Sequence, residues 1–130
     1  MTTNADRVRV DGKFLRLGDQ KFWVKGVTYG PFRPAPGSEV HLPGLKQIDG
    51  DFRQIRSLGG NTVRVYHAPP RWFLDVAQSQ GLKVLVDVPW SKHRCFLESR
   101  EDKQSARRAV KTAAATCKDH PALLALSVAN

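Results

Sequence analysis

The sequence has no long hydrophobic run, and this absence limits where the protein can reside. None of its apolar stretches approaches the roughly 20 residues that a membrane-spanning helix requires. The opening segment, MTTNADRVRV, is polar and lacks the apolar core of a secretory signal peptide. We therefore predict a protein with no membrane span and a cytoplasmic location.

Cysteine is scarce, with only Cys95 and Cys117 in 130 residues. No CxxC pair and no histidine at metal-ligand spacing accompanies them, and His41, His93 and His120 show no such spacing either, so we predict no metal site. A predicted helix holds the two cysteines far apart, whereas a disulfide requires Cα atoms within about 7 Å. We expect both thiols to be reduced, with Cys117 buried on a helix face.

Acidic residues are also few: 12 Asp and Glu stand against 21 Lys and Arg, for a net charge of +9. The basic residues are spread along the chain, although several lie on one predicted helix, where a solvated face explains them. These are Lys103, Arg107, Arg108, Lys111 and Lys118. No nucleic-acid-binding motif accompanies the charge. It predicts weak, salt-sensitive adhesion to polyanions and no specific nucleic-acid partner.

What the sequence does contain is a regular alternation of strand-like and helix-like segments. Turn signals at Asp11-Gly12 and Gly18-Asp19 predict a hairpin over residues 7–21, and the proline-rich segment Pro31–Gly44 predicts a loop. Four strands are expected at Phe22–Val27, Asn61–His67, Leu82–Trp90 and Leu123–Asn130. Three helices are expected at about 47–58, 70–81 and 103–118. Apolar spacing predicts that Leu58 and Trp72 face the core, together with Ala106, Ala109, Val110 and Ala114.

This alternation predicts an α/β fold with parallel strands joined by helical crossovers. An open, doubly wound sheet that binds a dinucleotide normally carries GxGxxG after its first strand, and the corresponding text here is GVTYGPFRP. A (β/α)₈ TIM barrel is therefore preferred. A complete barrel needs about 250 residues, so we predict that residues 1–130 are its N-terminal half, with the hairpin preceding four strands and three helices in 22–130. Such a half barrel exposes strand edges and would self-associate or require the missing C-terminal half.

In both architectures the functional side chains lie at the C-terminal ends of the strands. Arg64 lies within a strand between Val63 and Val65, so alternation sends its side chain to the opposite face from the valines. A guanidinium there needs a carboxylate partner, and Asp87 on the next strand is the nearest candidate. Two alternatives remain open: a structural salt bridge, or an arginine that orients a catalytic carboxylate. His67 ends the same strand as Arg64, where a lone histidine is more often a structural hydrogen-bonder than a catalyst.

Two aromatic residues also follow strands. Tyr29 and Trp90 could cap the core, or their exposed rings could form a platform on which a sugar stacks. Trp72, by contrast, has the helical spacing of a core residue.

The segment NTVRVYHAPPRWFLDVAQSQGLKVLVDVPW, together with HPALLALSVAN, resembles the first half of a clan-A glycoside hydrolase barrel. This clan includes β-galactosidase-like, cellulase-like and β-1,3-glucanosyltransferase-like enzymes. The resemblance implies that Arg64 hydrogen-bonds the nucleophilic carboxylate, that His67 lies beside the sugar, and that Asn130 contacts the sugar 2-hydroxyl. It also implies an acid/base glutamate directly after Asn130 and a nucleophile on the seventh strand. No cofactor is implied.

Three functions follow from these observations. The first is a fragment of a retaining, two-carboxylate hydrolase of oligo- or polysaccharide O-glycosidic bonds, inactive alone because neither catalytic glutamate is present. Asp87, Trp90 and Tyr29 would then contact the carbohydrate with His67. The second is a non-catalytic carbohydrate-binding or regulatory module, and the third is a basic polyanion-binding domain.

Overall fold

The computed structural model of the chain describes residues 6–89, 95 and 97–128. A small antiparallel sheet contains the strands β1 (Val8–Asp11), β2 (Phe14–Leu17) and β3 (Gln20–Lys21), in that spatial order. A parallel sheet follows, in the order β4 (Gly26–Thr28), β5 (Thr62–Val65), β6 (Lys83–Asp87) and β7 (Leu123–Ser127). The helices α1 (Leu45–Ser57), α2 (Arg71–Ser79) and α3 (Arg100–Cys117) connect the parallel strands. The prediction of an α/β fold with parallel strands is confirmed.

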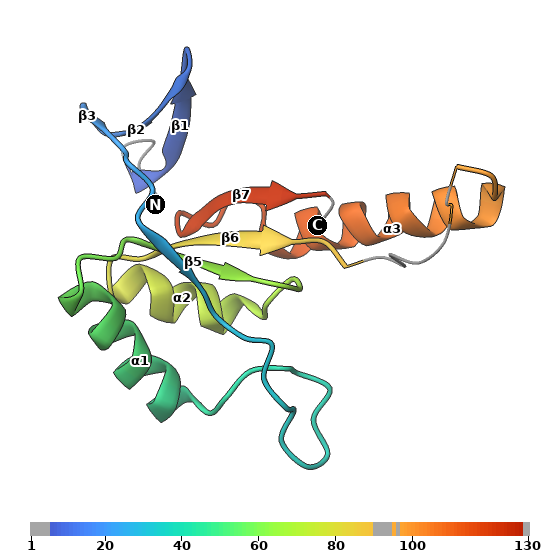
Figure 1. Cartoon of the computed structure of the whole chain (residues 1–130), viewed down its shortest axis with the longest axis horizontal. Helices are drawn as coiled ribbons and strands as arrows, with labels where there is room; N and C mark the ends of the chain where they lie inside the picture. Colours follow the sequence, from blue (N-terminus) through green and yellow to red (C-terminus); the bar gives the residue numbers. More distant parts are fainter. Residues whose placement is uncertain (1–5, 90–94, 96, 129–130) are drawn as a thin grey trace.

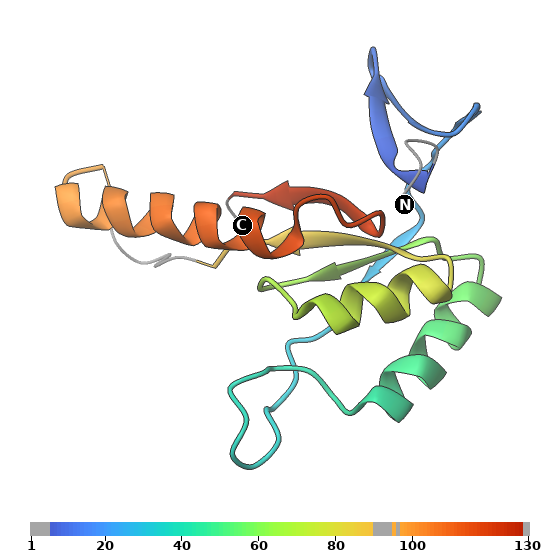
Figure 2. The ribbon, with the colours of Figure 1, turned by 180° about the vertical axis from the view of Figure 1, so that it is seen from behind.

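The helices all cover the same face of the parallel sheet. In Figure 1 the strands lie in front of α2 and α3, and in Figure 2, seen from behind, α2 and α3 lie in front of the strands, with α1 next to α2. A doubly wound sheet would carry helices on both faces, so the one-sided helix layer differs from the doubly wound alternative. It is compatible with a partial barrel, and the half-barrel assignment stays a prediction.

The strand pattern explains which face the helices cover. Val63 and Val65 in β5 and Val84 and Val86 in β6 are fully buried and share the helix-covered side. Between them, Arg64 pairs with Leu85 in the parallel register, and both are only partly buried on the opposite side. Alternation along each strand thus separates an apolar, helix-covered face from a mixed inner face.

An aromatic cluster fills the space between the sheet and the first two helices. Phe52 of α1 lies edge-on to Phe73 of α2, with ring centroids 5.4 Å apart, and both rings are fully buried. Tyr29, which follows β4, contacts both rings at 5.3 Å and 6.2 Å. Such aromatic pairs add stability beyond the area that they bury.

Two residues predicted to face the core do not. Leu58 is 86% exposed, because it is the C-terminal cap of α1 and the chain turns away at Gly59, whose φ is +86°. Trp72 is 41% exposed, because the buried face of α2 consists of Phe73, Leu74 and Ala77. The helix phase is set by these three residues, which leaves Trp72 on its outer side.

Helix α3 is longer and less buried than the sequence pattern predicted. It begins at Arg100, where the Ser99 hydroxyl accepts a hydrogen bond from the Asp102 backbone N–H at 3.2 Å. Its first half extends past the end of the sheet (Figure 1). Only Ala113 and Cys117 are therefore fully buried, and the four other predicted core positions, Ala106, Ala109, Val110 and Ala114, are only partly covered.

The antiparallel sheet lies beside the N-terminal ends of β6 and β7 and is joined to them by polar contacts (Figure 1). Lys83 Nζ donates to the backbone oxygens of Asp6 at 2.7 Å and Pro121 at 2.8 Å. Asn61 accepts from the Lys25 N–H at 2.9 Å and donates to the Trp23 oxygen at 2.8 Å. Together with the backbone bonds from Asn61 and Thr62 to the Lys25 oxygen, these contacts hold residues 23–25 beside the start of β5, and β4 begins at Gly26 and not at the predicted Phe22.

Both cysteines are free, as predicted: Cys95 is exposed and Cys117 is buried. Burial raises the pKa of the Cys117 thiol.

The aromatic cluster makes a quantitative prediction about stability. Replacing Phe52 by Ala leaves a cavity between α1, α2 and the sheet and should lower the free energy of unfolding by about 3–5 kcal/mol in urea denaturation. Leu58→Ala, at the exposed end of the same helix, should change it by no more than about 0.5 kcal/mol. Equal effects of the two substitutions would contradict the described core.

Candidate functional site

The candidate site lies on the inner face, at the C-terminal ends of β5 and β6. Parallel pairing of Val65 with Val86 brings the end of β5, with Tyr66 and His67, beside Asp87 at the end of β6. Tyr29 follows β4 at the same edge, where its backbone N–H donates to the Arg64 oxygen at 2.7 Å. The strand ends that the sequence predicted to carry the chemistry are therefore neighbours.

Arg64 and Asp87 form a bidentate salt bridge across the two central strands. Nη2 lies 2.6 Å from Oδ2, and Nε lies 3.0 Å from Oδ2 and 3.2 Å from Oδ1. The predicted ion pair is confirmed. The hydrogen bond to Asp87 raises the pKa of Arg64 further, so the guanidinium stays charged. The Asp87 side chain is only 4% exposed, whereas that of Arg64 is 32% exposed.

The partial exposure of Arg64 leaves part of its guanidinium available to a further partner. Among the residues that the structure describes, no acceptor bonds to Nη1. The Tyr66 ring supports the group from one side, with Cζ of Arg64 5.3 Å from the ring centroid. Sequence reasoning did not select Tyr66, although its place two residues after Arg64 puts it on the same side of an extended segment.

His67 is partly buried and lies beside a second histidine. The rings of His67 and His41 are 6.0 Å apart in an edge-to-face arrangement, and His41 comes from the loop between β4 and α1. Nε2 of His67 is buried and has no hydrogen-bond partner among the described residues. Burial, and secondarily the charge of His41, lower the pKa of His67, which is therefore a neutral imidazole at neutral pH. An orphaned ring nitrogen of this kind can accept or donate one hydrogen bond to a ligand hydroxyl.

Tyr29 occupies the core rather than an exposed platform. It is 7% exposed, and its hydroxyl donates to Asp51 Oδ2 at 2.7 Å. Burial, followed by the hydrogen bond to Asp51 and the charge of that carboxylate, raises the pKa of Tyr29. Of the two alternatives for this residue, the structure supports the core cap, and we leave Tyr29 out of the candidate site. Trp90 and Asn130 lie outside the described residues, so their predicted roles stay predictions.

The protein is thus an α/β protein in which helices cover one face of a parallel sheet. An ion pair and a histidine lie at the C-terminal strand ends on the other face. No protein-family model matches the chain, and no curated protein matches its sequence. Solved structures do match. The chain is similar to the β-glucuronidase of Bifidobacterium dentium, with a TM-score of 0.78 and 20% identity, over 95% of this chain and 20% of that one.

Two further structures match a similar share of the chain. The exo-chitosanase CsxA of Amycolatopsis orientalis has a TM-score of 0.69 and 16% identity, over 92% of this chain and 15% of that one. The protein ScGas2 has a TM-score of 0.66 and 20% identity, over 94% of this chain and 30% of that one. The chain thus has the fold of one segment of glycoside hydrolases, which confirms the resemblance that the sequence indicated. It spans less than a third of the length of each.

The described part of the chain has no helix whose length and apolarity would suit it to crossing a membrane.

The charged pair makes a prediction for a double-mutant cycle. Arg64→Met should destabilise the protein more than Asp87→Leu, because it strands a buried carboxylate, whereas an unpaired Arg64 can still reach water. The double variant should be more stable than the sum of the two effects predicts, as measured by urea denaturation. If the two effects are strictly additive, the coupling free energy between Arg64 and Asp87 is zero.

The lowered pKa of His67 makes a prediction about pH. Between that lowered value and the ordinary 6.5, the unfolded chain binds a proton that the folded protein does not. The free energy of unfolding should therefore rise with pH through this window and level off above it, and His67→Gln should flatten the rise. In the folded protein, NMR titration of the His67 ring should give a midpoint below 6.5, moved upward by His41→Gln. A midpoint at or above 6.5 would contradict the described burial.

Proposed function

We propose that this chain is the N-terminal part of a retaining glycoside hydrolase barrel that acts on O-glycosidic bonds of oligo- or polysaccharides. The observation that carries the proposal is the Arg64–Asp87 pair, which lies on the inner face beside His67 at the C-terminal strand ends. The similarity of the fold to solved glycosidases supports it. A cytoplasmic location remains part of the proposal and rests on the sequence alone.

In this proposal the chain binds and orients the substrate, and carboxylates from outside it perform the chemistry. Nη1 of Arg64 donates to the nucleophilic carboxylate, and Asp87 holds the guanidinium in place from the other side. His67 contacts a sugar hydroxyl through its orphaned Nε2. Trp90 stacks on the sugar ring, and Asn130 contacts the 2-hydroxyl.

The described residues do not supply both catalytic groups. A retaining mechanism needs two carboxyl groups about 5–5.5 Å apart, one as nucleophile and one as acid/base. The described strand ends carry one carboxylate, Asp87, and it is committed to Arg64. We therefore propose that residues 1–130 alone do not hydrolyse glycosides.

The inner face, which no described helix covers, and the two outer strands of the parallel sheet suggest what completes the site. β4 and β7 are the outer strands of the parallel sheet, and each is paired with a single strand in the described part of the chain. Further strands added at these edges would close the barrel, from the same polypeptide, from a second copy or from a partner chain. The acid/base glutamate would follow Asn130, and the nucleophile would come from the seventh strand.

The experiment that tests this proposal begins with the coding sequence beyond Asn130. A Glu codon in the next position, followed by reading frame for four more strand and helix units, is expected. The extended protein should then hydrolyse one of a panel of p-nitrophenyl β-glycosides, and the 130-residue chain should not. Arg64→Met in the extended protein should lower kcat by about 10²-fold, because it misplaces the nucleophile.

A different outcome would favour the non-catalytic alternative. An immediate stop codon, with oligosaccharide binding by the 130-residue chain and no turnover, would refute the hydrolase and support a carbohydrate-binding module. Steeply salt-dependent binding to heparin without any preference among neutral sugars would instead indicate a polyanion-binding domain.

A further inference from the structure

A second candidate site lies on the helix side of the molecule, away from the inner face. A groove of about 730 Å³ runs between the loop that follows β4 and helix α2. Its lining is mostly apolar and includes Val40 of the loop, Leu45 at the start of α1, and Trp72 and Val76 of α2. The volume lies within the range of small-molecule sites in proteins, which is about 300–1,000 Å³.

Trp72 gives this groove a flat aromatic surface. Because Phe73, Leu74 and Ala77 set the phase of α2, the indole faces outward and is 41% exposed. An exposed indole on a fixed helix offers a broad apolar face at little cost in conformational entropy.

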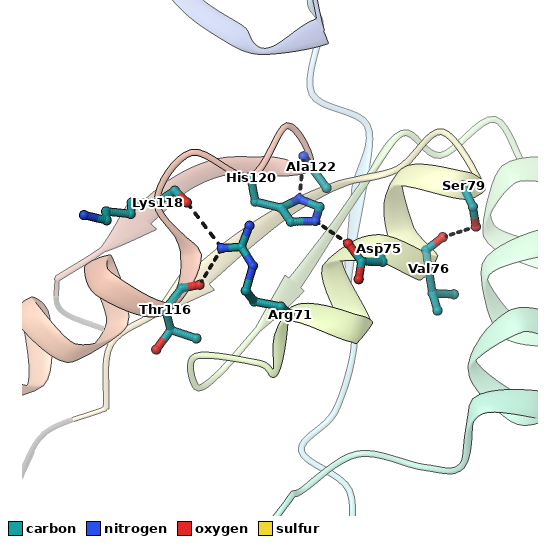
Figure 3. A network of polar contacts seen from close by, with 8 residues as sticks. All are labelled: Arg71, Asp75, Val76, Ser79, Thr116, Lys118, His120 and Ala122. Carbon is teal, nitrogen blue, oxygen red and sulfur yellow. Dashed lines mark hydrogen bonds and ion pairs between the residues drawn. The ribbon is translucent and has the colours of Figure 1, made fainter. Parts of the chain in front are cut away.

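Asp75, one turn later on α2, gives the groove an oriented hydrogen-bond acceptor. Its Oδ1 lies 2.8 Å from Nε2 of the buried His120 (Figure 3). His120 Nδ1 accepts a hydrogen bond from the Ala122 N–H at 3.1 Å, so the proton of the neutral ring is on Nε2 and is donated to Asp75. One carboxylate oxygen is thus anchored. Among the described residues the other, Oδ2, has no partner, and the side chain is 69% exposed.

The end of α2 that carries these two residues is held firmly in place. Arg71 Nη1 donates to the backbone oxygens of Thr116 at 3.0 Å and Lys118 at 3.4 Å, at the C-terminal end of α3 (Figure 3). Across the groove, Ser38 Oγ accepts from the Val40 N–H at 3.1 Å, which leaves its own hydroxyl proton for donation. The groove therefore combines an aromatic platform with an acceptor on one side and a donor on the other.

The charges limit which ligand fits. Asp75 repels an anionic group in the groove, and the net charge of +9 disfavours a free cation approaching the molecule. A second copy of the chain, which also carries a net charge of +9, would be repelled by the charge of the first. A neutral ligand with an apolar face for Trp72 and hydroxyl groups for Asp75 and Ser38 satisfies every feature, and a pyranose ring has this combination.

We propose that this groove binds a neutral oligosaccharide, with one pyranose ring stacked on Trp72 and its hydroxyls donating to Asp75. The site is separate from the strand-end site, and it does not depend on whether the protein hydrolyses glycosides. It would hold a polysaccharide chain to the outer surface of the domain.

The proposal is tested by NMR titration of the ¹⁵N-labelled chain with cellopentaose and laminaripentaose. We expect one of them to bind with a Kd of about 1 mM. The shift changes should centre on the Trp72 indole N–H and the amides of Val40, Leu45 and Val76. A shift pattern confined to His67 and Tyr66 would place binding at the strand ends and overturn the groove proposal.

Variants separate the contacts. Trp72→Ala should weaken binding at least tenfold, and Asp75→Asn about threefold, whereas Trp23→Ala, at an exposed tryptophan beyond the hairpin, should leave it unchanged. Trigalacturonic acid should not shift the groove resonances of the wild type at about 150 mM salt, and Asp75→Asn should increase its binding in the groove. If Trp72→Ala does not fold, the wild-type shift map decides. Absence of any Trp72 shift at 20-fold the expected Kd, or a Trp72 shift that depends on protein concentration alone, would overturn the proposal.

Discussion

The ion pair between Arg64 and Asp87 is the constraint on which the inner face depends. A guanidinium in the middle of a sheet cannot lose its charge, and burying a carboxylate as deeply as Asp87 costs much free energy unless it has a partner. The parallel register of β5 and β6 places the two within reach of a bidentate contact. The pair therefore makes the C-terminal end of the inner face polar and oriented, while Val63, Val65, Val84 and Val86 keep the other face apolar.

The one-sided helix layer follows from the same separation of faces. Each crossover returns the chain to the sheet over the valine-rich side, where Phe52 and Phe73 complete the core. No described helix covers the side with Arg64, so its polar end stays accessible. In a doubly wound sheet a second helix layer would enclose this arginine, and the cost of desolvating it would be much larger.

The sequence predicted some of these features and missed others for identifiable physical reasons. Alternation within a strand is a strict period of two, so the side on which Arg64 lies could be predicted from its valine neighbours. Helix phase is weaker information, because Trp72, Phe73 and Leu74 are all apolar and adjacent, and only packing decides which of them face the sheet. The burial of Tyr29 depended on Asp51, 22 residues away, to satisfy its hydroxyl. No local pattern contains such a pairing, and none indicated that His120 would anchor Asp75.

The loop between β4 and α1 connects the two candidate sites. His41 of this loop lies beside His67 at the strand ends, and Ser38 and Val40 of the same loop line the groove opposite Trp72. The sheet and α2 behind it are fixed by the aromatic core and by the Arg71 contacts. Residues 38–41 of the loop thus supply a hydroxyl donor and an apolar side chain to the groove and a histidine to the strand-end site, so the two candidate sites share one segment of the chain.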